Sequence, residues 1–244
     1  MKIQKLFFNL PAGVVLTSAY LEKMGITPQL VQKYKKSGWL ERLGGGAYFR
    51  KQESISWEGA LWAIQQNKKV FLAGKSALEI QGYEHFLSFG NRNLDIAYEE
   101  KFASPLWLRS NPLGAAWHFS KAPLKTVPLL NEVMVNQISL SVSCLEQAIL
   151  ECCAWLPKYY TFEEVGYFME SLTSLRPEIL QNLLEKGCSF KARRVFLFLA
   201  ERTKHSWFRE LNTSKLSLGD HKIQIQKRGI FNAKYLMTVP KGFS

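Results

Sequence analysis

The sequence predicts an α+β protein with an N-terminal winged helix-turn-helix followed by a mixed α/β domain. Three observations lead to this fold class. Two short helical segments lie on either side of one glycine turn within residues 17–36, and a glycine-linked pair of strand-like segments follows at residues 39–50. Beyond them, helix-spaced and alternating apolar segments follow one another without repeats or long linkers. We therefore expect a winged helix-turn-helix domain over residues 1–52 and an α/β domain over residues 53–244, in which residues 53–92 form a helical connection.

The charge of the chain is strongly positive and unevenly distributed. The 244 residues carry 32 Lys and Arg against 20 Asp and Glu, a formal net charge of +12. The net charge is +6 over residues 1–50, −4 over residues 51–185 and +10 over residues 186–244. Two basic ends favour a polyanionic partner such as nucleic acid, although a charged solubilising surface would have the same composition.

The composition also excludes several classes of protein. A hydrophobic content of 47% with only 4 cysteines excludes a disordered tail and a disulfide-stabilised miniprotein. The longest apolar run, residues 195–200, is far shorter than the roughly 20 residues that cross a bilayer. The first residues lack the pattern of a secretory signal. We expect a soluble cytoplasmic protein with no membrane partner.

Three helices are expected in the N-terminal segment. The first covers residues 1–9, where the apolar residues have helical spacing, and the second covers residues 19–24 after a hydroxyl side chain that can cap it. Gly25 then makes a turn. The third helix starts at Thr27-Pro28, because a hydroxyl N-cap followed by proline is a favoured helix start, and it ends near Lys36.

The third helix separates an apolar face from a polar one. Leu30, Val31 and Tyr34 share one face, and the opposite face has amide and ammonium side chains but no acid. Glutamine can read adenine edges, and lysine can contact guanine or phosphate. We therefore expect this helix to enter the major groove of double-stranded DNA. The DNA-binding residues predicted on it are Thr27, Gln29, Gln32, Lys33, Lys35 and Lys36.

A β-hairpin wing is expected after the third helix. Two short strands flank Gly44-Gly45-Gly46, and Arg42 and Arg50 lie on the two stems. These arginines are predicted to grip the DNA backbone or the minor groove beside the third helix. A module of this kind can instead dock another protein, but the basic face of the third helix favours DNA. The glycine run lacks the Lys-Ser/Thr of a phosphate-binding loop.

The remaining elements alternate between helices and strands. A helix starts after Ser56, and a capping-box pattern of Ser143 with Glu146 opens another that ends near Trp155. Further helices are expected at residues 76–82, 162–171, 177–186 and 190–202, and strands at 93–98, 133–141, 222–226 and 235–239, the last two around a turn at Arg228-Gly229.

Two groups of basic residues lie near the C-terminus. Lys191, Arg193 and Arg194 lie at the N-terminus of a predicted helix, where cations oppose the helix dipole. They form either an antitoxin or anion-binding surface or a set of charges that is neutralised by Glu178, Glu185 or Glu201. The second group, Lys222, Lys227 and Arg228, is interpreted as a charged edge that discourages aggregation.

Catalytic and metal-binding patterns are weak. The cysteines at positions 144, 152, 153 and 188 lack metal-ligand spacing and are expected to be buried reduced thiols. Asp95, Glu99 and Lys101 are compatible with a metal-dependent nuclease, but their spacing is shorter than such sites normally have. We expect no catalytic activity, no metal and no cofactor.

Several motifs, taken in their order along the chain, are shared with a known family. They are Gly38-Trp39-Leu40-Glu41-Arg42 with Gly46 and Tyr48; Ala77-Leu78-Glu79-Ile80 with Gly82-Tyr83 and His85; Pro105 with Trp107; Ser143 with Glu146 and Leu150-Glu151; Leu175-Arg176-Pro177; Lys191 with Arg193-Arg194; Phe196-Leu197 with Glu201; His205 with Trp207; and Thr238-Val239-Pro240. Over nearly its whole length the chain resembles the AbiEi-type antitoxins of type IV toxin–antitoxin systems, in the branch with an N-terminal winged helix.

The resemblance implies both a partner and a function. Similar proteins bind inverted repeats in their own promoter through the winged helix and repress the operon, as part of abortive-infection defence against phage. Their C-terminal domain counteracts a nucleotidyltransferase-like toxin without requiring a stable complex with it. The alternative is a stand-alone winged-helix transcriptional regulator whose C-terminal domain binds a ligand or a partner.

Overall fold

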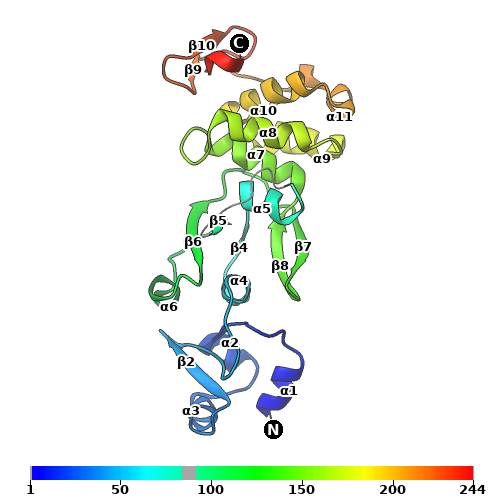
Figure 1. Ribbon diagram of the computed structural model, residues 1–244. Coiled ribbons are helices and arrows are strands. Elements are labelled where there is room, and N and C mark those ends of the chain that lie inside the picture. The colour runs from blue at the N-terminus through cyan, green and yellow to red at the C-terminus, as the bar shows by residue number, and fades with distance from the viewer. Residues whose placement is uncertain (1, 84–91, 244) are drawn as a thin grey trace. The chain divides into compact units, whose positions relative to one another are not determined.

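The computed structural model describes residues 2–83 and 92–243, which form two compact units (Figure 1). Unit 1 consists of Met1–Leu72, Ser88–Lys121 and Glu132–Val142, and unit 2 of Ala73–Leu87, Ala122–Asn131 and Ser143–Ser244. The predicted α+β class is confirmed. The domain boundary expected between residues 52 and 53 stays a prediction, and His85 of the family motifs lies outside the described residues.

Unit 1 begins with a winged helix-turn-helix. Its elements in chain order are α1 (Lys2–Phe8), β1 (Leu16–Thr17), α2 (Ser18–Lys23), α3 (Pro28–Lys36), β2 (Leu40–Gly44) and β3 (Ala47–Arg50). The strands form an antiparallel sheet in the order β1-β3-β2. The three predicted helices and the predicted hairpin are therefore confirmed.

Local side chains explain where these helices start. The Thr17 hydroxyl accepts a hydrogen bond from the Tyr20 amide, and the Thr27 hydroxyl accepts one from the Leu30 amide. Behind α2 and α3, the side chains of Leu21, Ile26, Val31 and Tyr34 are buried. Burial of these apolar side chains fixes which face of α3 points outward.

The rest of unit 1 contains α4 (Trp57–Gln65), α6 (Leu106–Ser110) and most of a five-stranded sheet. The sheet has the order β6-β5-β4-β8-β7, with β4 (Val70–Leu72) antiparallel to β5 (Arg92–Tyr98) and parallel to β8 (Ile138–Ser143). Strands β5 and β6 (Ala115–Lys121) are parallel, and β7 (Leu130–Val135) is at the other edge.

Helix α4 lies directly against the start of the winged helix. A Cβ atom added at Gly59 would lie 2.0 Å from the Gly13 carbonyl oxygen and 2.8 Å from the Val14 Cα. The Val15 amide also donates to the Gly59 carbonyl at 3.3 Å. Only glycine permits this backbone approach.

The single strand expected over residues 133–141 is wrong. Asn136 and Gln137 have φ values of 48° and 66° and form a two-residue turn between β7 and β8. Both central residues of such a turn have positive φ, the pattern of a tight type I′ hairpin. The alternation of apolar and polar residues continues through the turn, so it does not reveal the break.

Unit 2 is mainly helical. Its longer helices α7 (Leu145–Trp155), α8 (Phe162–Ser171) and α10 (Phe190–Thr203) pack against one another, as Figure 1 shows. The shorter α5 (Gly74–Ile80) and α9 (Pro177–Asn182) contact α7, and α9 continues as a π-helical turn over Leu183–Gly187. The predicted helices are confirmed within a few residues at each end.

The C-terminal part of unit 2 differs from the expected hairpin. It has α11 (Ser206–Arg209) and three short strands, β9 (Ile223–Gln224), β10 (Ile230–Asn232) and β11 (Met237–Val239), in the order β10-β11-β9. Strand β11 pairs antiparallel with β10 and parallel with β9, so the turn at Arg228-Gly229 joins strands that are not neighbours. Lys222, Lys227 and Arg228 are all exposed along this edge.

The capping box predicted at Ser143 is also wrong, because Ser143 belongs to a buried polar cluster. Cys144 is the residue before α7, and the Ser143 hydroxyl donates to Glu151 Oε1 at 3.0 Å. Gln147 Nε2 donates to the same oxygen at 2.8 Å, and the Gly74 amide donates to Glu151 Oε2 at 2.8 Å. Burial raises the pKa of Glu151 to about 7, against these hydrogen bonds, which lower it.

Candidate nucleic-acid interface

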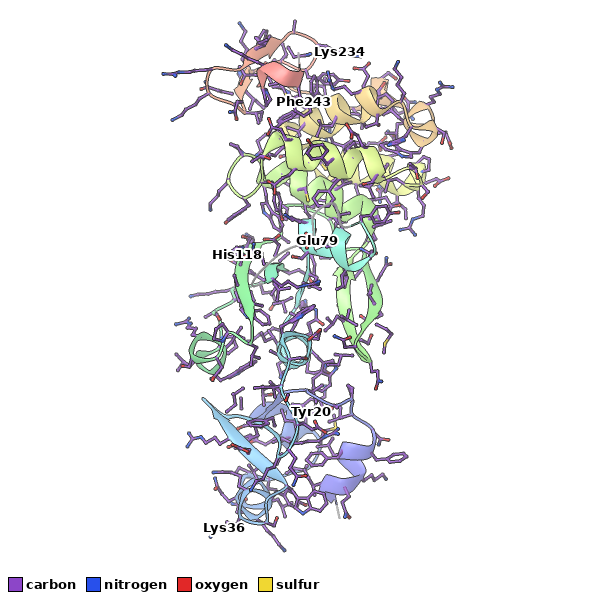
Figure 2. All side chains as sticks on the ribbon, viewed as in Figure 1. Tyr20, Lys36, Glu79, His118, Lys234 and Phe243 are labelled. Carbon is purple, nitrogen blue, oxygen red and sulfur yellow. The ribbon has the colours of Figure 1, made fainter. Side chains whose placement is uncertain are left out.

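Helix α3 presents a polar face to solvent. Gln29, Gln32, Lys33 and Lys36 are exposed and Lys35 is half-buried, whereas Val31 and Tyr34 are 4% exposed on the opposite face. Figure 2 shows Lys36 at the end of α3 with its side chain directed away from the fold. Lys35 Nζ donates to Gln32 Oε1 at 3.4 Å, the only hydrogen bond between these polar side chains within the described residues. The other amide and ammonium groups on this face of α3 are therefore free to bind a ligand.

The position of α3 is fixed at both ends. The Thr27 hydroxyl and Pro28 start the helix, and Thr27 remains exposed. At its end, the Ser37 hydroxyl donates to the Lys33 carbonyl at 3.0 Å and the Trp39 amide donates to the Tyr34 carbonyl at 2.9 Å. The lysines lie in the last turn, where the helix dipole favours positive charge. A fixed helix loses little conformational entropy on binding a ligand.

Arg42 lies on the solvent side of the wing, and its contact with DNA stays a prediction. It is exposed on β2, opposite Tyr48 of β3, and has no hydrogen-bond or ion-pair partner among the described residues. The neighbouring Glu41 points to the other side of the hairpin, because successive side chains of a strand alternate. The basic side of the wing is therefore separate from its acidic side.

Arg50 does not face solvent, which corrects the prediction that it grips DNA. Its side chain is only 14% exposed, and Nη1 lies 2.9 Å from Glu53 Oε1. Nη2 donates to the carbonyls of Phe7 and Leu10 at 2.9 and 2.6 Å. Arg50 joins the wing to the N-terminal segment, and its Nη1 and Nη2 donors are used inside the fold. The sequence does not reveal this because the accepting carbonyls are about forty positions away.

The basic group at the start of α10 is likewise internal. Arg193 and Arg194 are 6% and 1% exposed. Arg193 Nε donates to the Leu184 carbonyl at 2.7 Å, and Arg194 Nε donates to the Leu218 carbonyl at 2.6 Å. Lys191 Nζ donates to the Leu156 carbonyl, and burial lowers the pKa of this ammonium.

Neither interpretation of this basic group fits Arg193 and Arg194, whereas a surface role of Lys191, which is half-buried, stays a prediction. The two guanidinium groups do not form a surface for an anion, and no carboxylate of Glu178, Glu185 or Glu201 contacts them among the described residues. Backbone carbonyls hold them instead: Arg193 also donates to Ser217, and Arg194 also donates to His221 and Leu236. They attach the segment after residue 216 to α10.

The other candidate sites are not assembled as the sequence suggested. The Asp95 side chain is 11% exposed and lies 3.5 Å from His118 Nδ1, whereas Glu99 and Lys101 are exposed beyond the end of β5. In the described ranges, no three His, Cys, Asp or Glu side chains are grouped as ligands for a metal ion.

Cys144, Cys152 and Cys153 are buried free thiols, and Cys188 is half-buried. Among the described helices, none has the length and apolar composition to cross a membrane.

The sequence also missed a helix that supports the wing. Helix α6 contacts β2, and a Cβ added at Gly45 in the wing tip would lie 3.3 Å from the Trp107 amide nitrogen. Pro105 ahead of a short apolar run is the only sequence signal for this helix.

This architecture defines the chain as a winged helix-turn-helix protein with a further α/β region. Residues 1–89 match the family model described as "Transcriptional regulator, AbiEi antitoxin N-terminal domain", and residues 92–240 match "Transcriptional regulator, AbiEi antitoxin, Type IV TA system". The chain belongs to the AbiEi antitoxin family, the transcriptional regulators of type IV toxin–antitoxin systems.

A solved structure has a similar fold. The crystal structure of the RV2827C protein from Mycobacterium tuberculosis aligns with 96% of this chain and 88% of its own chain, with a TM-score of 0.58. Its sequence identity of 16% means that the likeness extends to the fold alone. No curated protein matches the chain.

Proposed function

We propose that this protein is a sequence-specific DNA-binding autorepressor and the antitoxin of a type IV system. It binds inverted repeats in its own promoter and antagonises a nucleotidyltransferase-like toxin. The observation that supports DNA binding most directly is the exposed face of α3, which has amide and ammonium groups and no acid. Membership in a family of transcriptional regulators supports the same proposal.

In this proposal α3 enters the major groove. Gln29, Gln32 and Lys33 face the base edges, and Lys35 and Lys36 contact phosphates. Thr27 lies at the start of the helix, where its hydroxyl and the nearby amides approach the backbone. Arg42 contacts the DNA backbone from the wing, without Arg50. Two protein molecules on an inverted repeat place one α3 in each half-site.

The antitoxin role of the protein does not require a stable complex with the toxin. The proposal leaves Arg193 and Arg194 out of the antitoxic surface, because both side chains are buried. Neither catalysis nor a cofactor is part of the proposal.

DNA binding is tested with the full chain and the duplex upstream of its own gene. We expect Lys36→Ala to weaken binding to all sequences and to reduce the slope of log K against log salt by about one unit. Gln32→Ala should instead reduce discrimination at one base pair by about 1–3 kcal/mol. Lys186→Ala, which removes an exposed lysine from unit 2, is the matched control. An unchanged salt dependence in the Lys33/Lys35/Lys36 triple alanine variant would refute the DNA-facing assignment.

Toxin antagonism is tested by co-expression with the product of the adjacent reading frame. The wild-type chain should rescue growth, and the triple alanine variant should still rescue growth from a heterologous promoter while losing repression. Failure of the wild-type chain to rescue, with DNA binding intact, would leave the stand-alone regulator as the function.

A further inference from the structure

The tip of the wing is made of glycine and rests on α6. Gly44, Gly45 and Gly46 all have positive φ, at 126°, 48° and 76°, so the tight turn depends on residues that lack side chains. A Cβ added at Gly45 would be 3.3 Å from the Trp107 amide nitrogen and 3.6 Å from the Leu106 Cβ. In Figure 1 the free end of β2 points to α6. The wing therefore has no side chain at its tip with which to read a groove.

Helix α6 is held firmly in this position. Trp107 and Leu108 are 4% and 2% exposed and anchor the helix in unit 1. Asn111 Nδ2 donates to the Trp107 carbonyl at 3.0 Å, and Trp117 Nε1 donates to the Pro112 carbonyl at 2.8 Å. These contacts fix the helix and the segment that follows it.

The outer side of α6 carries an apolar and a cationic side chain. Leu106 is 70% exposed, and Arg109 in the last turn is exposed. The Arg109 guanidinium has no hydrogen-bond or ion-pair partner in the part of the chain that the structure describes. The buried side chains of α6 thus hold the exposed Leu106 and Arg109 next to the wing tip, which has no side chains of its own.

We infer that α6 supplies the minor-groove contact that the glycine tip of the wing cannot make, with Arg109 in the groove and Leu106 against the base step beside it. This inference rests on the proposed DNA binding and adds α6 to α3 as a second element that recognises the DNA. Gly45 follows Arg42 by three residues, beyond the bulge between Arg42 and Gly44, and lies against α6. Because α6 lies against the tip of the wing, Leu106 and Arg109 enter the groove there, while Arg42, farther back on the stem, contacts the DNA backbone.

The chemistry of these two side chains sets the preferred DNA. An arginine in the minor groove favours A·T-rich sequence, because the groove is narrower there and its negative potential is stronger. An exposed leucine can partly unstack a base step and kink the duplex. The preferred ligand is therefore a duplex with an A·T-rich flank beside the half-site that α3 reads.

The experiment compares two fluorescent duplexes made from the DNA upstream of the gene. Footprinting of the full chain locates the half-sites, and the adjoining flank is then made either all A·T or all G·C. We expect wild-type protein to bind the A·T flank about tenfold more tightly, and Arg109→Ala to bind the two flanks equally. Leu106→Ala should reduce the bend of the duplex, measured by energy transfer between its ends. Arg209→Ala, which removes an exposed arginine from the last turn of another short helix, is the matched control.

The possible outcomes separate this inference from the proposed function. If wild-type protein binds no duplex, DNA binding itself fails and the inference fails with it. If wild-type protein binds but Arg109→Ala keeps the same flank preference and the same salt slope, only the role of α6 is overturned. If Arg109→Ala loses the flank preference while Arg209→Ala retains it, the role of α6 is supported.

Discussion

Replacement of Arg194 by methionine provides a direct test of how unit 2 is held together. The guanidinium is 1% exposed and contacts three backbone carbonyls. Nε donates to Leu218 at 2.6 Å, and Nη1 donates to His221 at 2.7 Å and to Leu236 at 3.0 Å. Burial lowers the pKa of Arg194, but a guanidinium remains charged at neutral pH. One side chain of α10 thus holds two separate stretches of the C-terminal segment.

The expected loss of stability follows from these contacts. Hydrogen bonds to a charged group contribute about 1.5–3 kcal/mol each, and they are not additive when one donor group makes all of them. Methionine keeps the apolar stem but leaves three carbonyls without this donor. Each buried carbonyl left without a donor costs about 1–3 kcal/mol, and because the three costs are not additive we expect a loss of about 3–5 kcal/mol for Arg194→Met. A loss of that size is a large fraction of the roughly 5–15 kcal/mol by which domains are stable.

Urea unfolding followed by circular dichroism measures the change, with exposed Arg228→Met as the control for loss of charge. Limited proteolysis should cut the variant first between residues 217 and 236, because this segment loses its attachment to α10. A difference below about 1 kcal/mol between Arg194→Met and Arg228→Met would refute the reasoning. In that case the carbonyls would be satisfied by other donors.

Two further predictions concern close packing and buried charge. Gly59→Ala should destabilise the protein by about 3 kcal/mol or more in thermal unfolding, because the new Cβ would lie 2.0 Å from the Gly13 carbonyl oxygen. Gly242→Ala, with open space around it, should have no such effect, and equal stability of the two variants would contradict the packing argument. The raised pKa of Glu151, about 7, stabilises the fold at low pH, and up to about 3 kcal/mol should be lost as pH rises from about 4.5 to 7. Glu151→Gln should remove this part of the pH dependence in urea unfolding, and an unaltered pH profile would show that Glu151 does not titrate as argued.

The sequence is sufficient to predict those helices and turns whose signals come from neighbouring residues. Helix α3 starts after Thr27 and ends at Lys36 as predicted, because the cap, Pro28 and the apolar spacing are all local signals. The glycine hairpin is predictable for the same reason. The exposed face of α3 follows from the positions of Val31 and Tyr34, which must be buried.

The sequence does not predict the place of a side chain whose hydrogen bonds go to backbone carbonyls far away along the chain. Arg42 and Arg50 lie on the same hairpin, but only Arg50 meets the carbonyls of Phe7 and Leu10. In the sequence Arg194 resembles a surface cation, because the Leu236 carbonyl that accepts one of its hydrogen bonds lies 42 positions later. Charge counts therefore overestimate the binding surface at the C-terminus, because buried arginine has the same formal charge as exposed arginine.

The sequential discontinuity of the two units has a consequence for synthesis and for truncation. Each unit is built from three separate stretches of chain, so unit 1 is complete only after residue 142 has been made. The winged helix can form its local contacts early, but the support that α6 gives to the wing must wait for residues 106–110 to emerge from the ribosome. A gene shortened at either end would remove strands or helices from a partly built unit. Point variants that preserve both units are therefore the appropriate means of separating the proposed repression from the proposed antitoxin activity.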